Sequence, residues 1–339
     1  MPVLIRDNIN LALFIGSLLL GAAGALLIAK TAYRIHLLDY PAKRSSHEVT
    51  TPKGGGVGIL AAFLLASLTL KLPAVFVLSA TLISVVSFYA DSRRLGVKIR
   101  LIIHFLAAFL MIMAFLNIAS FSQIFPPTFF LLLFCSLFVV ATANFYNFMD
   151  GIDGMAGIAG LIGFGLIFFY YYQFLHTGPQ PISPYVILAG CMAFSCSGFL
   201  SLNLPRAKVF MGDVGSILLG FVFAGLIMKL SENINDFVCM ASFLFLFYAD
   251  ELTTLWVRVR NHEKLTQPHR RHLYQLLANE LQVRHWKVAM LYGVSQLIVG
   301  FSVMAIRRQG LSLVLLFLSG CFLLFVLISF YIRHKIRPV

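Results

Sequence analysis

Apolar runs separated by short polar loops follow one another along almost the whole chain. A run of about 17–22 apolar residues is long enough to cross the roughly 30 Å hydrocarbon core of a bilayer as a helix. Only Lys71, Leu72 and Pro73 separate the second run from the third, so the number of spans is ten or eleven. We therefore predict an all-α, polytopic integral membrane protein. The pattern places its eleven spans at about 9–29, 55–70, 73–89, 101–116, 128–144, 155–175, 185–202, 214–230, 236–257, 288–306 and 311–332.

The composition excludes a soluble fold. Hydrophobic residues make up 60% of the 339 residues and charged residues only 12%, which is too few to cover the surface of a soluble protein of this size. The five cysteines all lie inside apolar runs and form no Cys-x-x-Cys pair, which excludes a disulfide framework and a zinc site. We treat residues 1–339 as a single transmembrane domain.

The formal charge of +13 fits a membrane orientation better than nucleic-acid binding. Lysine and arginine gather in alternate loops, with the exception of the loop at 144–154, and such clusters mark the cytoplasmic side of a membrane protein. The exceptions are Arg6, Lys71, Lys229, Arg307 and Arg308. We therefore predict an N-terminus on the outer side of the membrane, which is the periplasmic side if the protein lies in the bacterial inner (cytoplasmic) membrane. The cytoplasmic loops are predicted at about 30–55, 90–100, 144–154, 203–213 and 257–287.

The first two cytoplasmic loops combine glycine, cations and one acid. Lys53 precedes Gly54–Gly56 at the start of a predicted helix, where a close backbone approach and the helix N-terminus favour an anion. A flexible hinge is the alternative interpretation of these glycines. In the second loop Asp91 stands before a basic cluster that includes Arg94 and Lys98.

The third loop carries polar residues at a helical spacing. Asn144, Asn147, Asp150 and Asp153 are three residues apart, which predicts one polar helical face that glycines interrupt at its inner end. No lysine or arginine in the segment balances the two acids, and an unbalanced polar face is costly near lipid. Helix capping accounts for one of the acids but not for the series.

The last two loops contribute an acid, an aromatic residue and a basic cluster. Asn203, Phe210 and Asp213 surround a glycine-rich turn, where helix capping by Asp213 and core packing of Phe210 are the alternatives. The His-Arg-Arg-His cluster at His269–His272 suits an anionic ligand, because arginine pairs with phosphate and repels metal cations. Ordinary surface residues are the alternative there.

Carboxylates that recruit Mg²⁺ and cations that hold phosphate are the components of phosphoryl transfer. The neighbouring bilayer suggests that one substrate is a lipid. A transporter or flippase for a nucleotide sugar or a lipid-linked sugar is the main alternative. It predicts charges near the middle of the membrane and internal repeats, whereas the acids of this chain lie at the ends of the spans.

Several segments together resemble the polyprenyl-phosphate N-acetylhexosamine-1-phosphate transferase family of the MraY and WecA type, and within it the WbpL-like enzymes that initiate O-antigen synthesis. The matching segments occur in the family's order, from about residue 39 to 275. They are DYPAKRSSHEVTTPKGGGVG, ADSRRLGVKIR, NFYNFMDGIDGMAG, NLPRAKVFMGDVGS, FYADELTTLWVRVR and QPHRRHLYQ.

The resemblance implies a single glycosyl-1-phosphate transferase domain that transfers a sugar 1-phosphate from a UDP-sugar to undecaprenyl phosphate and releases UMP. It implies Mg²⁺ as the cofactor, for which Mn²⁺ can substitute. It also implies that the protein forms a homodimer. The implied catalytic residues are Asp91, Asp150, Asp153 and Asp213, of which Asp213 and Asp91 bind the metal. The implied substrate-binding residues are Lys53, Arg94, Lys98, Asn147, Asn203, Phe210, His269, Arg270 and His272, with Asn203 and Phe210 at the uracil.

Two positions depart from the family pattern. Ala90 stands where the family has the first of two adjacent acids, the one proposed to deprotonate the lipid phosphate. The basic cluster also lacks a run of three histidines, which favours a small N-acetylhexosamine such as GlcNAc or FucNAc. The MurNAc-pentapeptide of peptidoglycan synthesis is the less favoured substrate.

Overall fold

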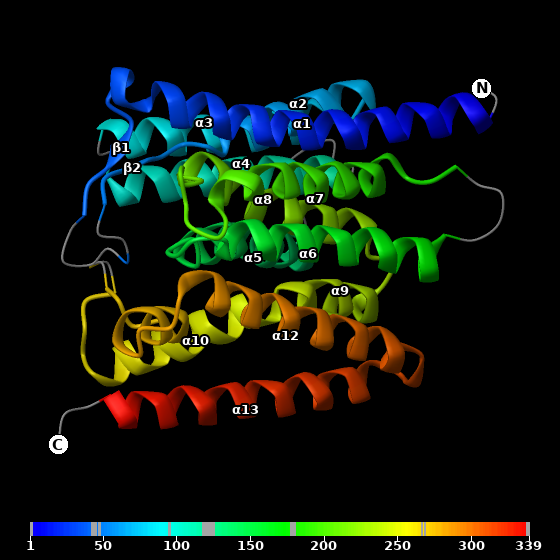
Figure 1. Ribbon diagram of the computed structural model, residues 1–339. Coiled ribbons are helices and arrows are strands. Elements are labelled where there is room, and N and C mark those ends of the chain that lie inside the picture. The colour runs from blue at the N-terminus through cyan, green and yellow to red at the C-terminus, as the bar shows by residue number, and fades with distance from the viewer. Residues whose placement is uncertain are drawn as a thin grey trace.

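The computed structural model describes residues 3–41, 46, 49–93, 96–116, 126–176, 181–265, 267 and 269–336. The chain is an all-α polytopic membrane protein, which confirms the predicted fold class (Figure 1). The α-helices are α1 (Val3–Ile35), α2 (Val57–Thr69), α3 (Ala74–Arg93), α4 (Val97–Phe115), α5 (Pro126–Phe148), α6 (Met155–Tyr170), α7 (Pro184–Asn203), α8 (Asp213–Leu230), α9 (Ile234–Ala241), α10 (Phe245–Arg260), α11 (Leu273–Gln275), α12 (His285–Ile306) and α13 (Leu311–Ile336).

Shorter elements connect several of these helices. The π-helical turns η2 and η4 and the 3-10 turns η3 and η5 continue α6, α11, α9 and α12. They span η2 (Tyr171–Leu175), η3 (Ser242–Leu244), η4 (Leu276–Glu280) and η5 (Arg307–Gln309). The strands β1 (Leu38–Asp39) and β2 (Thr51–Pro52) pair in antiparallel register.

Within the described residues, 10 helical segments are long and apolar enough to cross a membrane, the lower of the two predicted numbers. The segment expected at 55–70 forms α2, which has only 13 residues. At 1.5 Å per residue it covers about 20 Å, which is less than the hydrocarbon core. The segment expected at 236–257 runs from α9 through η3 into α10 as one span.

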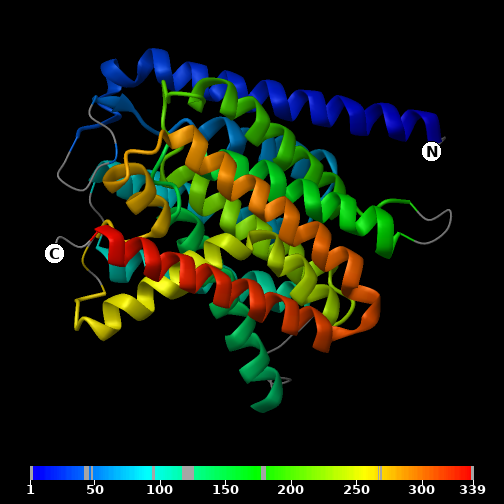
Figure 2. The ribbon, with the colours of Figure 1, turned by 60° about the horizontal axis from the view of Figure 1, so that its bottom comes forward.

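Helix α8 forms the centre of the bundle, and α13 lies at its edge. Of the membrane-crossing window of α8, 83% is buried, against 11% for α13. In Figure 2 α1 lies along one edge and α13 crosses the side that faces the viewer, while one end of α5 extends beyond α13. The central position of α8 matters because its first residue is Asp213, one of the predicted site residues.

The glycines at the start of α2 bring two loops together. The N–H groups of Gly54 and Gly55 donate to the carbonyl of Phe210, at 3.1 and 2.9 Å. A Cβ on Gly56 would overlap Gly215 in the first turn of α8. The backbone amides of this run are therefore used inside the protein, and the predicted anion cradle is wrong.

Candidate active site

Three of the predicted acids line one cavity of about 710 Å³ at the end of the bundle where β1 and β2 lie (Figure 1). We call it the acidic cavity. Asp91 comes from the end of α3, Asp150 from the loop after α5, and Asp213 from the start of α8. The N–H of Asp213 donates to Oδ2 of Asp91 at 3.1 Å. Gly212 precedes it with φ of 72°, a left-handed conformation that glycine adopts without strain.

Two cations neutralise two of these three carboxylates. Lys53 Nζ lies 3.2 Å from Oδ1 of Asp91, in the wall of the same cavity. Arg100 Nη2 lies 2.7 Å from Oδ2 of Asp213. The described residues provide no ion pair for Asp150. Burial, and then the charges of Asp213, Asp91 and Asp153, raise its pKa well above the usual range.

The donor chemistry of the acidic cavity fits a hard divalent cation. Carboxylate oxygens are the ligands that Mg²⁺ prefers, and an added positive charge would relieve the repulsion at Asp150. Among the described residues no group of three His, Cys, Asp or Glu side chains could hold a metal ion alone. Such an ion would therefore rest on one or two carboxylates and complete its shell with phosphate oxygens and water, as Mg²⁺ commonly does.

Asp153 points into a different cavity. The predicted polar helical face ends early, because α5 stops at Phe148 and the chain turns before Gly154, whose φ is 82°. Only Asn144 and Asn147 remain on the helix. Asp153 Oδ2 lies 3.3 Å from Nδ1 of His285 at the start of α12.

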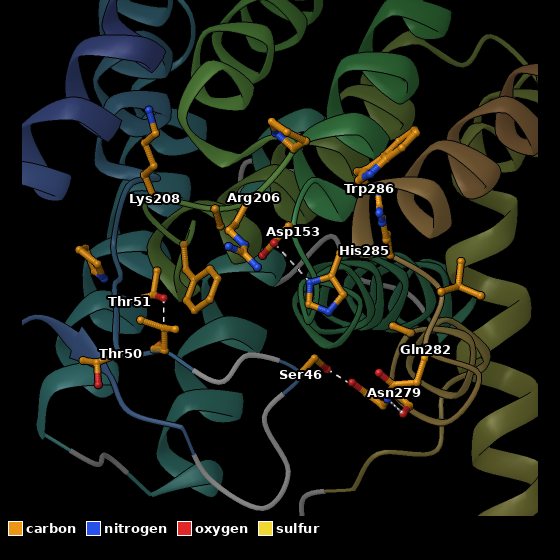
Figure 3. Close-up of a pocket in the computed structure, with 18 of the residues that line it drawn as sticks. Ser46, Thr50, Thr51, Asp153, Arg206, Lys208, Asn279, Gln282, His285 and Trp286 are labelled. Atoms are coloured by element: carbon orange, nitrogen blue, oxygen red, sulfur yellow. Dashed lines mark hydrogen bonds and ion pairs between the residues drawn. The ribbon is translucent and has the colours of Figure 1, made fainter.

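This second cavity, of about 1080 Å³, is rich in cations, and we call it the basic cavity (Figure 3). Asp153 and His285 face each other in it, and Arg206, Lys208 and Trp286 also line it. Arg270 and Arg284 add two further cations to its wall. Phe210 lines both cavities, so they adjoin one another at that ring.

The two predicted asparagines hold loops in place. Asn203 is buried; its side-chain oxygen accepts from the N–H of Gly154 at 2.7 Å, and its Nδ2 donates to the carbonyl of Val209 at 2.9 Å. It therefore ties the loop of Asp150 to the loop of Phe210, and both ends of its amide are engaged. Asn147 accepts through Oδ1 from the hydroxyl of Ser216 at 2.5 Å, also at the acidic cavity.

The cluster His269–His272, which we call the histidine–arginine loop, divides between the two cavities. His269 lines the acidic cavity and Arg270 the basic cavity. Arg271 turns to Glu263, with 2.9 Å between Nη2 and Oε1. Burial, and then the positive charges of His272, Arg258 and Arg271, lower the pKa of His269 to about 3.

His272 is packed between two buried acids of α10. Its Nδ1 lies 3.6 Å from Oδ1 of Asp250, and its Nε2 lies 3.5 Å from Oε2 of Glu251. The side chain is only 3% exposed although it borders the acidic cavity. This ring supports the wall of the cavity more than it offers a free cation to a ligand.

One predicted cation, Lys98, does not line either cavity, whereas Arg100, which was not predicted, lines the acidic cavity. Lys98 is exposed and lines neither cavity, and Arg94 lies outside the described residues. Arg100, and not Lys98, is the cation that α4 contributes to the acidic cavity. The buried positions His104 and Ala107 lie one and two turns after Arg100, so the helical period places Arg100, and not Lys98, on the inner face.

Two further acids were missed inside a predicted span. Asp250 accepts from the N–H groups of Leu273 and Tyr274 at 2.8 and 3.3 Å, and so anchors the chain after the histidine–arginine loop. Glu251 is 2% exposed and lines the acidic cavity. Acids within a membrane span are rare and usually functional, which was the signal available in the sequence.

Known proteins match the part of the chain that carries three of these acids. The model of glycosyl transferase family 4 matches residues 73–231, which contain Asp91, Asp150 and Asp213. The undecaprenyl-phosphate alpha-N-acetylglucosaminyl 1-phosphate transferase of Salmonella typhi is 26% identical over 74% of this chain and 71% of its own length. A probable undecaprenyl-phosphate N-acetylglucosaminyl 1-phosphate transferase of Bacillus subtilis (strain 168) is 27% identical over 94% of this chain and 88% of its own.

The matches to the family model and to these relatives support the polyprenyl-phosphate N-acetylhexosamine-1-phosphate transferase family. A decaprenyl-phosphate N-acetylglucosaminephosphotransferase of Mycobacterium leprae is 30% identical, over 32% of this chain and 30% of its own length. The match to the family model ends at residue 231, so the histidine–arginine loop and the C-terminal helices lie beyond it. Asp91, Asp150 and Asp213 therefore come from the part that the family model describes, whereas Glu251 lies beyond it.

Proposed function

We propose that this transferase moves N-acetylhexosamine 1-phosphate from a UDP-sugar, such as UDP-GlcNAc or UDP-FucNAc, to undecaprenyl phosphate and releases UMP. The observation that carries the proposal is the junction of an acidic and a basic cavity at Phe210. A nucleotide sugar needs cations for its phosphates, an aromatic surface for its base, and carboxylates for the metal at the reacting phosphorus. The two cavities together offer all three.

The ring of Phe210 can stack on the uracil, with the phosphates continuing toward the acidic cavity. Its backbone is fixed on both sides, since its N–H donates to the carbonyl of Pro52 at 2.8 Å and its carbonyl accepts from Gly54 and Gly55. A rigid ring loses little entropy when it binds a flat base. Arg206, Lys208 and Arg270 of the basic cavity supply positive charge beside it.

The reaction is a single displacement at phosphorus. An oxygen of undecaprenyl phosphate forms a bond to the β-phosphorus of the UDP-sugar, the bond from that phosphorus to the bridging oxygen breaks, and UMP leaves with that oxygen. Asp91 and Asp213 would hold Mg²⁺ or Mn²⁺, which when bound neutralises the charge of the diphosphate. Lys53 and Arg100 keep the two carboxylates oriented through their ion pairs.

The orientation and the pathway are part of the same proposal. The basic loops support a position of the cavities on the cytoplasmic face of the bacterial inner membrane. The lipid-linked sugar would then start a surface polysaccharide such as O-antigen.

The test is transfer by the purified protein in detergent with a short polyprenyl phosphate. UDP-GlcNAc, UDP-FucNAc and UDP-QuiNAc serve as donors, and UMP and lipid-linked sugar are measured together. We expect equal amounts of both products from at least one donor, no turnover in EDTA, and none from Asp213→Asn. A transporter or flippase would release no UMP, and full activity in EDTA would exclude the metal.

A further inference from the structure

A guanidinium group from the last helix reaches the histidine–arginine loop. Arg333 lies near the end of α13, and its Nη2 donates to the carbonyl of Arg271 at 2.6 Å and to the hydroxyl of Thr254 at 3.2 Å. Its Nε donates to the hydroxyl of Ser329, one turn earlier, at 3.1 Å. These contacts orient the guanidinium so that it joins α13, α10 and the loop.

Other contacts hold the side chains of Arg271 and His272 and the backbone after the loop. Asp250 is fully buried and accepts from the N–H groups of Leu273 and Tyr274. Within the loop, the carbonyl of Arg271 also accepts from Thr254, but at 3.4 Å. Arg333 therefore provides the shorter of the two contacts to that carbonyl.

The fixed peptide lies between side chains that face different cavities. Arg270, directly before it, lines the basic cavity, and His269 lines the acidic cavity. Tyr274, which follows, donates through its hydroxyl to the carbonyl of Phe148 at 2.9 Å, next to the loop that carries Asp150. A shift of the Arg271 peptide would move the side chains on both sides of it.

The other contacts of helix α13 do not account for a cation at position 333. It is the least buried of the membrane-crossing segments, and Trp256 of α10 packs against its Phe330 with ring centroids 5.5 Å apart. Lys335, two residues after Arg333, is exposed. The charge of Arg333 is thus used inside the protein, whereas that of Lys335 fits the general excess of cations at this end.

We propose that Arg333 is a positioning residue for the donor: it fixes the Arg271 peptide and thereby the places of His269 and Arg270 in the two cavities. The donor-binding part of this inference rests on the proposed function. The last helix then acts as a brace for the active site in addition to crossing the membrane.

The kinetic test compares Arg333→Ala with Lys335→Ala, which removes the same charge from the same helix. We expect Arg333→Ala to lower kcat/KM for the UDP-sugar about tenfold, because small misplacements of binding groups are costly, while KM for polyprenyl phosphate stays unchanged. Lys335→Ala should match the wild type. Added guanidinium should restore part of the loss, and methylammonium should not. Equal losses in both variants, or no loss at Arg333→Ala, would overturn the proposal.

A second measurement tests, without any catalytic assay, whether Arg333 fixes the Arg271 peptide. Hydrogen exchange of the peptide that covers residues 269–276 should be faster in Arg333→Ala and unchanged in Lys335→Ala. Trp256 fluorescence, read in a Trp286→Phe background, should be the same in both, which shows that α13 stays docked. Unchanged exchange would refute the brace. If the wild type released no UMP while exchange increased as expected, the proposed function would fail and the brace would stand.

Discussion

At the scale of single residues, His269 differs from a surface histidine in its charge. Its pKa of about 3 in the folded protein means that the ring is neutral, while in the unfolded chain the ring titrates near its ordinary pKa of 6.5. As the pH falls below that value, the unfolded state takes up a proton that the folded state does not, so the folded state loses stability. The expected signature is a melting temperature that falls less steeply with acidification in His269→Gln than in the wild type. Thermal unfolding in detergent between about pH 7.5 and pH 5 measures both slopes, and equal slopes would contradict the neutral ring.

Ala90 bears on whether the lipid phosphate must be deprotonated by a protein base or attacks directly. A phosphate monoester has a second pKa near 6, so most of the lipid phosphate is already dianionic at pH 7 and needs no base. Ala90 is 6% exposed beside Asp91, whose carboxylate is held by Lys53 and by the amide of Asp213. We expect Ala90→Asp to change kcat by less than about tenfold, or 1.4 kcal/mol, and Asp91→Asn to cost far more. Steady-state rates with saturating substrates measure both, and a large gain in Ala90→Asp or a trapped phosphosugar–enzyme adduct would refute the single displacement.

At the scale of elements, a buried ion pair fastens the helices at the end of the bundle opposite to the cavities. Arg307 of η5 donates to Oδ1 of Asp236 on α9 at 2.8 Å, and its Nε donates to the hydroxyl of Tyr170, at the end of α6, at 2.8 Å. The tyrosine in turn donates to the same carboxylate at 2.6 Å. The side chain of Asp236 is 1% exposed, so it depends on these partners.

Removal of the arginine should destabilise the fold without touching the site. Arg307→Ala leaves a buried carboxylate without its cation, which costs about 3 kcal/mol. The neighbouring Arg308 is exposed, so Arg308→Ala removes the same charge and should be nearly neutral. Unfolding in detergent, followed by circular dichroism, compares the two variants. Similar stabilities would show that the ion pair contributes nothing measurable.

The residues at which the helices end were harder to predict than the existence of the helices. The three-residue spacing from Asn144 to Asp153 predicts one helical face, but α5 ends at Phe148. Helical periodicity does not show where glycines and tertiary contacts end a helix. Asp150 and Asp153 therefore reach different cavities, although the sequence pattern groups them.

At the scale of the whole molecule, the apolar runs were enough to predict the fold class, because a bilayer demands long helices. Asp91, Asp150, Asp153 and Asp213 could also be found, since acids stand out in so apolar a chain, but Glu251 was missed. The residues with which the cations pair could not be predicted from the sequence. Arg307 and Arg333 count equally as orientation signals in the sequence, yet each has a specific partner that only the packing of distant helices provides.

The orientation of the bundle remains a prediction, and the structure supplies two exposed positions that test it. Arg308 and Lys335 lie at the two ends of α13. If the positive-inside rule holds here, Arg308→Cys faces the periplasm and Lys335→Cys the cytoplasm. A membrane-impermeant maleimide should label Arg308→Cys in cells whose outer barrier is opened, and Lys335→Cys only after the inner membrane is permeabilised. The parent protein is the control, because four of its five cysteines are buried. The reverse labelling would place both cavities on the periplasmic side, where a charged UDP-sugar held in the cytoplasm could not reach them.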